Sequence, residues 1–161
     1  MTHAELVKRA ERWLRNVCRC GVVLCEVGTA EIPDAIGWRY GGRLSIIVEC
    51  KASRADFLAD KQKPFRKPGN PSAMGDERYF LTVPGIAKVD ELPECWGLLE
   101  LTGSGIKCRK KAERQIPMSS RKTCEMALLW SELRLYQMAA SGRELFPSKR
   151  AARIQRIVRS Q

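Results

Sequence analysis

The sequence predicts one domain of the α/β (α+β) class, in which helices flank a mixed central sheet. Hydrophobic patterns along the 161 residues follow the order helix, three strands, helix, strands, helix, which is typical of a layered fold. Hydrophobic residues make up 44% of the chain, enough for a real core. No apolar run reaches the roughly eighteen residues that predict a membrane span.

An amphipathic helix is expected over residues 3–18, because apolar residues recur at helical spacing between charged ones. The apolar set is Leu6, Ala10, Trp13, Leu14 and Val17. The N-terminal residues alternate charged with apolar side chains and show no signal-peptide core. We therefore expect a cytoplasmic protein.

Three strands are expected next. "GVVLCEV" (21–27) is the first, and "PDAIGWRY" (33–40) forms a hairpin with "LSIIVECK" (44–51) around the turn "GGR" (41–43). A helix should follow, because Ser53 and Asp56 have the spacing of a helix start. It should end or kink near Lys63, since Pro64 cannot donate a backbone hydrogen bond.

Further strands are predicted at 78–84 and 95–103, the second paired with 106–112 through the turn "GSG". A long helix from Ser120 to Ala140 should then direct a set of apolar side chains toward a core. The set is Met126, Leu129, Trp130, Leu133 and Met138. We expect residues 1–112 to form the core of the fold and residues 113–161, a helix and a basic tail, to pack on it.

The third strand carries two opposite charges, Glu49 and Lys51, near its C-terminal end. Side chains two positions apart on a strand point to the same face, so this pair shares one site. It is the only Asp/Glu-x-Lys triplet in the chain. The pair is either a surface ion pair or part of a functional site, and the C-terminal ends of strands commonly present ligand sites.

Asp34, at the start of the neighbouring strand, suggests a metal site. Hairpin pairing should bring its carboxylate close to Glu49, and a divalent cation would relieve their repulsion. Mg²⁺ (or Mn²⁺) accepts few protein oxygens and several waters, and Asp34, Glu49 and the backbone carbonyl of Cys50 would supply such a set. Lys51 would orient or deprotonate a water and stabilise charge on a phosphoryl group. This arrangement suits hydrolysis of a phosphodiester.

Positive charge is concentrated in the C-terminal part. Residues 1–100 contain fifteen basic and fourteen acidic side chains, whereas residues 101–161 contain fourteen and four. This distribution favours a polyanionic partner, in particular nucleic acid, over a solvated basic tail. In the tail, arginines recur every three residues from Arg150 to Arg159. They suit a helix along a phosphate backbone or an arm that orders on binding, and the neighbouring apolar residues equally suit a protein partner.

Other residues are candidates for nucleic-acid contacts. Trp38 and Tyr40 lie on the predicted site hairpin and could stack on an unpaired base, although Trp38 is also a core candidate. The residues that suit phosphates are Lys63, Arg66, Lys67, Lys149, Arg150, Arg153 and Arg156. A solvated face would show the same pattern.

Cysteine and histidine set limits on the chemistry. The chain contains seven cysteines, an odd number that favours reduced thiols. An iron–sulfur site at Cys18, Cys20 and Cys25 is the weaker alternative. The single histidine, His3, lies at the end of the chain and is a poor candidate for a site. Acid–base chemistry should therefore depend on other side chains.

Several stretches resemble the PD-(D/E)xK nuclease superfamily, in particular its MmcB-like DNA-repair branch and related phage proteins. They are "PDAIGW", "VECKASRADFLADKQK", "RYFLTVP" and "LPECWGLLEL", and the resemblance covers residues 3–101. It implies a restriction-endonuclease-like αβββαβ core and metal-dependent cleavage of DNA in repair, recombination or phage DNA metabolism. It also implies Asp34 and Glu49 as metal ligands and Lys51 as the catalytic lysine.

The resemblance implies auxiliary residues as well. Many members of the superfamily add an acidic residue on the first helix, for which Glu5 or Glu11 would serve, with Glu26 and Glu31 as competitors. Similar proteins carry a Ser-x-x-Asp-Phe stretch and a downstream lysine near the site, here Ser53, Asp56, Phe57 and Lys61. Some members only bind DNA, so a non-cleaving nucleic-acid-binding or phage accessory protein is the alternative. Many nucleases of this kind dimerise, and a homodimer is a further option.

Overall fold

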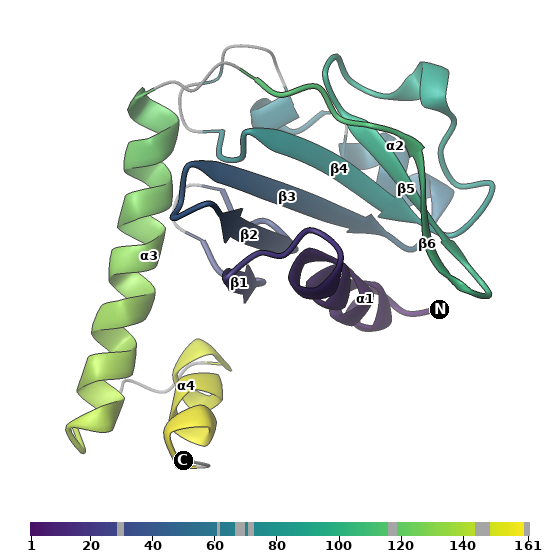
Figure 1. Cartoon of the computed structure of the whole chain (residues 1–161). Helices are drawn as coiled ribbons and strands as arrows, with labels where there is room; N and C mark the ends of the chain where they lie inside the picture. Colours follow the sequence, from purple (N-terminus) through teal and green to yellow (C-terminus); the bar gives the residue numbers. More distant parts are fainter. Residues whose placement is uncertain are drawn as a thin grey trace.

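The computed structural model describes residues 1–28, 31–60, 62–66, 70, 73–115, 119–143 and 149–159. It contains one mixed sheet of six strands in the spatial order β1-β2-β3-β4-β5-β6, with helices on both faces (Figure 1). The predicted α+β class with a flanked mixed sheet is confirmed.

The strands follow the predicted order. They are β1 (Val22–Cys25), β2 (Ala35–Arg39), β3 (Leu44–Lys51), β4 (Glu77–Thr82), β5 (Gly97–Thr102) and β6 (Gly105–Lys110). Strands β1, β2 and β3 pair antiparallel, β3, β4 and β5 pair parallel, and β6 is antiparallel to β5. Both predicted hairpins are therefore present. The C-terminal ends of the three parallel strands meet at one edge of the sheet.

The helices are α1 (His3–Asn16), α2 (Arg54–Asp60), α3 (Ser119–Ala140) and α4 (Lys149–Arg159), with short 3₁₀ helices η1 (Pro64–Arg66) and η2 (Val89–Glu91). Ser53 precedes α2, and its Oγ accepts a hydrogen bond from the Asp56 backbone N–H at 3.2 Å, as the sequence predicts for a helix start. In the part of the chain that the structure describes, no helix is long and apolar enough to cross a membrane.

The core lies on both faces of the sheet. On one face, Leu6, Ala10 and Leu14 of α1 pack against apolar residues from β2 to β5. On the other face, Leu128 of α3 packs on Ile36, Trp38, Ile47 and Met74, and Phe57 of α2 packs on Phe80, Trp96 and Leu98. Val17 follows α1 and is exposed, so its predicted place on the apolar face of that helix is wrong.

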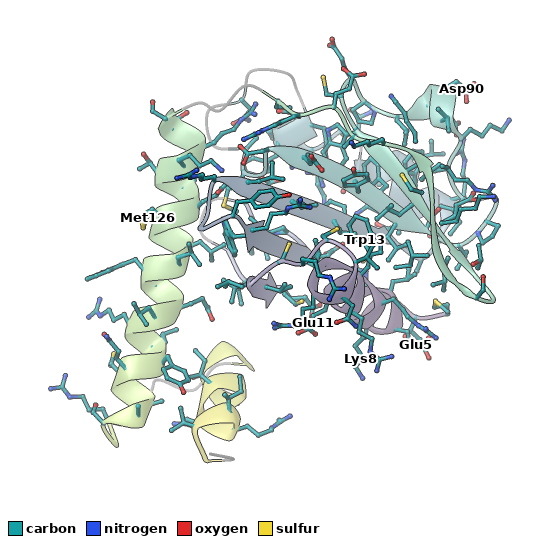
Figure 2. All side chains as sticks on the ribbon, in the orientation of Figure 1. Glu5, Lys8, Glu11, Trp13, Asp90 and Met126 are labelled. Atoms are coloured by element: carbon teal, nitrogen blue, oxygen red, sulfur yellow. The ribbon has the colours of Figure 1, made fainter. Side chains whose placement is uncertain are left out.

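The predicted inward face of the long helix is wrong for three of its five residues, whereas Leu129 and Met138 are partly buried against other apolar residues. Met126, Trp130 and Leu133 are 65%, 66% and 53% exposed, and Met126 lies on the side of α3 away from the sheet (Figure 2). The buried residues of α3 are Arg121, Glu125, Leu128 and Glu132. Polar partners orient the helix, because the Glu125 carboxylate accepts hydrogen bonds from Trp38 Nε1 at 2.9 Å and Ser45 Oγ at 2.7 Å.

This orientation predicts unequal effects for two substitutions on α3. Leu128→Ala empties a fully buried position and should lower the free energy of unfolding by about 2 kcal/mol or more. Trp130→Ala removes an exposed side chain and should change it by about 0.5 kcal/mol at most. Urea titration of both variants measures the difference, and a larger loss for Trp130→Ala would contradict the orientation of α3.

Candidate functional site

The structure brings Asp34 and Glu49 together at one end of the β2–β3 hairpin. Ala35 pairs with Val48 in the antiparallel register, so Asp34, one residue earlier, lies opposite Glu49. One carboxylate oxygen of Asp34 accepts a hydrogen bond from the Cys50 backbone N–H at 2.7 Å. This bond fixes the Asp34 side chain against the end of β3.

Lys51 lies beside this pair and is almost fully buried. Its Nζ is 2.8 Å from Asp60 Oδ1 and 3.7 Å from Glu49 Oε2. A third carboxylate, that of Asp56, lies at 4.0 Å. The side chains of Lys51 and Glu49 are only 4% and 3% exposed. Their interpretation as a surface ion pair is therefore wrong.

Asp60 is a central residue of the site that the sequence did not reveal. Its buried carboxylate contacts Lys51 and Lys63, both at 2.8 Å, and accepts hydrogen bonds from Arg66. One signal was available, because Asp60 lies in the last turn of α2, where the helix dipole disfavours negative charge. An acidic residue at that position needs a compensating cation.

Arg66 is buried in the site, so its predicted role as a surface phosphate contact is wrong. Its guanidinium lies 3.1 Å from Glu49 and 3.1 Å from Glu31, and also pairs with Asp60. It packs 4.9 Å above the ring of Trp96. Proline at position 64 starts the 3₁₀ turn η1, which ends at the buried Arg66.

Glu31 binds arginines and is not a free carboxylate for a metal. It pairs with Arg66 and with Arg78 of β4, and it accepts a hydrogen bond from the Met74 backbone N–H at 2.9 Å. Arg78 is itself fully buried. The expectation that Glu31 serves as an auxiliary ligand is therefore wrong, because its oxygens already neutralise two buried guanidinium groups.

The acidic residues of α1 also interact with partners outside the site. Glu5 forms a capping box with Thr2 at the start of the helix, and Glu11 pairs with Arg15 at 3.1 Å on the surface. Both project from the outer side of α1 (Figure 2). Glu26 is exposed, and its carboxylate lies 3.9 Å from His3. Position therefore favours Glu26 over Glu5 and Glu11 as an auxiliary acid.

His3 belongs to the site, contrary to the sequence-based expectation. It is the first residue of α1, and its Nε2 lies 3.5 Å from Asp34 Oδ1. The side chain is 42% exposed, so the imidazole forms the solvent side of the Asp34 environment. Sequence position alone could not show this, because the approach depends on how α1 crosses the sheet.

Burial and mutual charge shift the pKa values of the acidic groups. Burial raises the pKa of Glu49 to about 7, and the charge of Asp34 contributes while Arg66 and Lys51 oppose it. Burial also raises the pKa of Asp34, against the hydrogen bond from Cys50. For Asp60, burial is outweighed by Arg66, Lys51 and Lys63, which hold its pKa well below the usual range.

Lys51 is a cation at neutral pH. Burial alone lowers its pKa, but the hydrogen bond to Asp60 and the charge of Glu49 outweigh that effect and raise the pKa above its ordinary value. A lysine with a raised pKa is a poor proton acceptor. Of the two roles expected for it, stabilising negative charge fits this environment and deprotonating a water does not.

The donor set suits one type of metal ion only. Among the described residues, no three His, Cys, Asp or Glu side chains are placed to hold a metal, so the cysteines Cys18, Cys20 and Cys25 do not converge on a cluster site. Asp34, Glu49 and the Cys50 carbonyl provide oxygen ligands, and Mg²⁺ accepts few of these together with water. The residues therefore fit a magnesium-type cation.

The predicted nucleic-acid contacts divide into two groups. Trp38 is buried and donates to Glu125, so its role in base stacking is wrong. Tyr40 is 65% exposed at the hairpin turn, with the Arg39 guanidinium 4.1 Å from its ring. Lys63 is half-exposed beside the site. Lys61 and Lys67 lie outside the described residues.

The basic tail forms helix α4, which packs on α3. Ala151 and Ile154 are buried against Tyr136, Met138 and neighbouring residues of α3, beside the end of α3 that extends past the sheet (Figure 1). Arg156 is exposed. The side chains of Lys149, Arg150 and Arg153 lie outside what the structure describes.

Comparison with known proteins adds a fold neighbour. No family model and no curated protein matches the chain. A solved structure, the SPO1766 protein of unknown function from Silicibacter pomeroyi, is similar with a TM-score of 0.65 and 22% sequence identity. The match covers 91% of this chain and 99% of that one. At this identity the similarity shows a shared fold.

Proposed function

We propose that the chain is a metal-dependent nuclease that hydrolyses DNA phosphodiester bonds on a restriction-endonuclease-like core. The observation that carries the proposal is the convergence of Asp34, Glu49 and Lys51 at one end of the β2–β3 hairpin. The order α1, β1, β2, β3, α2, β4 also matches the αβββαβ core of the PD-(D/E)xK superfamily that the sequence resembles.

The residues of the site would have different roles in the reaction. Asp34 and Glu49 would bind Mg²⁺ or Mn²⁺ together with the Cys50 carbonyl, and the cation would supply charge stabilisation and an activated water. Lys51, held by Asp60, presents a fixed ammonium that stabilises negative charge developing on the phosphoryl oxygens. His3, on the solvent side of Asp34, is placed to orient a water.

DNA is the proposed partner because of the charge distribution. Lys63 and Arg156 are exposed cations, and residues 101–161 contain ten more basic than acidic side chains. Tyr40 offers an exposed ring for stacking. We place the activity in DNA repair, recombination or phage DNA metabolism in the cytoplasm.

The test is cleavage of single-stranded, duplex and branched DNA with Mg²⁺, Mn²⁺ or EDTA. Wild-type protein should cut in a metal-dependent manner. Asp34→Asn and Glu49→Gln, which remove ligand charge, should each reduce cutting at least about a hundredfold. Glu11→Gln is the matched control, because within the described part of the chain this acid pairs with Arg15 alone, and its cleavage rate should be unchanged. Cutting that persists in EDTA would contradict the proposal.

A second candidate is a DNA-binding protein that does not cleave. It is favoured by the balance of charge in the site, where buried lysine and arginine side chains already compensate the carboxylates. This candidate predicts salt-sensitive DNA binding without a metal requirement. Absence of cutting on every DNA, with such binding retained, would select it.

A further inference from the structure

Arg66 forms an ion pair with Glu49, a carboxylate that the proposed metal ion would need as a ligand. Its guanidinium is 3.1 Å from Glu49 Oε2, and Glu49 is one of only two side chains proposed to bind the cation. The Arg66 side chain is 3% exposed, so it is a buried part of the site. A divalent cation and Arg66 therefore compete for the same carboxylate.

The charges of the cluster are nearly balanced in this arrangement. It contains five acidic side chains, Glu31, Asp34, Glu49, Asp56 and Asp60, and four basic ones, Lys51, Lys63, Arg66 and Arg78. A divalent cation would add two positive charges to a largely buried region, where uncompensated charge is costly. The phosphates of a bound DNA strand would compensate that excess.

Arg66 has partners other than Glu49. It retains Asp60 through two hydrogen bonds and Glu31 at 3.1 Å, and its face stays against Trp96. A small shift of the guanidinium away from Glu49 would therefore keep it paired.

We propose that Arg66 is a built-in counter-ion that competes with the divalent cation for Glu49, so that metal binding is weak until DNA phosphate is present. Arg66 is a positioning residue in this scheme, since it acts through Glu49 and does not touch the substrate. The inference rests on the proposed metal site but not on cleavage. It makes the metal affinity of free protein a property that one substitution should change.

The direct test is Mn²⁺ affinity, measured by electron paramagnetic resonance without DNA. Arg66→Met keeps an unbranched apolar side chain in place of the arginine stem and removes the charge, so it should bind Mn²⁺ about tenfold more tightly or better. Lys63→Met is the matched control, because Lys63 contacts Asp60 and not Glu49; its affinity should change by much less. Equal affinity in wild type and Arg66→Met would overturn the inference.

Wild-type protein provides a second test of the competition between Arg66 and the metal ion, which can be used if Arg66→Met does not fold. The Nε–H of Arg66 is buried and hydrogen-bonded to Asp60, which suits its detection by NMR. Its signal should shift when Mg²⁺ and a cleavage-resistant oligonucleotide are added together, and less with Mg²⁺ alone. An unchanged signal with both present would overturn the inference.

The result is separable from the proposed nuclease activity. Tighter Mn²⁺ binding by Arg66→Met, together with no DNA cleavage by the wild-type protein, would support the role of Arg66 as a counter-ion and refute the nuclease proposal. Metal-dependent cleavage with equal Mn²⁺ affinities would support the nuclease and refute the counter-ion.

Discussion

Lys51→Ala is expected to abolish DNA cleavage while DNA binding is nearly unchanged. Lys51 is buried, is a cation at neutral pH and is held 2.8 Å from Asp60. A fixed ammonium contributes where negative charge develops in the reaction, and removing one such group costs about a hundredfold to a thousandfold in rate. Its contribution to ground-state DNA affinity should be small, because little of its surface is exposed.

Lys63→Ala is the control for this substitution. Lys63 contacts the same Asp60 oxygen at the same 2.8 Å distance, but its side chain is 52% exposed. It should lose little cleavage rate and show a modest, salt-dependent loss of binding. Single-turnover cleavage and fluorescence anisotropy on both variants separate the two effects. A Lys51→Ala protein that still cuts at the wild-type rate would refute the catalytic assignment.

Asp60→Asn is expected to destabilise the fold strongly. Asp60 is fully buried and neutralises both Lys51 and Arg66. Asparagine has nearly the same shape but no charge, so the variant leaves these cations insufficiently compensated. Breaking a buried pair in this way costs about 3–5 kcal/mol, which is a large fraction of the stability of a domain of this size.

The matched control is Asp56→Asn on the same helix. Asp56 is half-exposed and lies 4.0 Å from Lys51, so its loss should cost about 0.5 kcal/mol or less. Urea titrations of both variants at neutral pH measure the difference. Similar losses for the two variants would show that Asp60 does not have the role assigned to it.

The effect of Asp60 depends on pH in a defined direction. Its pKa in the folded protein lies below its ordinary value, so its stabilisation is complete above the unfolded-state pKa and is lost as pH falls through the folded one. The stability difference between wild type and Asp60→Asn should therefore be largest at neutral pH and shrink in acid. A difference that grows in acid would contradict the assigned pKa.

The sequence predicts the sheet well because strand patterns are local. Alternation along residues 44–51 separated the two faces of β3, and the hairpin turn followed from its glycines. These features also placed Asp34 near Glu49. The inward face of the long helix α3 could not be predicted in this way, because its apolar residues are spread around the helix. A hydrogen bond between Trp38 and Glu125, 87 residues apart, helps to fix its inward face, and no local pattern contains that information.

The remaining errors at the site have the same origin. The sequence around Arg66 predicts a surface cation. Only the path of the chain after Pro64 buries Arg66 and brings it to Glu49. Likewise, the sequence around Glu31 suggests an unpaired acid, whereas in the fold its carboxylate pairs with Arg78 of β4. The position of His3 near the N-terminus gives no sign of its role, although α1 carries it to Asp34. Buried charge pairs between distant segments cannot be recognised from one segment at a time.

The buried ion cluster has a consequence for how the protein folds. Its charges come from four separate parts of the chain, around Glu31, Glu49, Asp60 and Arg78. A partly formed structure that lacks any one part buries a charge without its partner, at a cost of several kcal/mol. Intermediates with an incomplete cluster are therefore unfavourable. We expect strands β3 and β4 and helix α2 to unfold in a single cooperative transition.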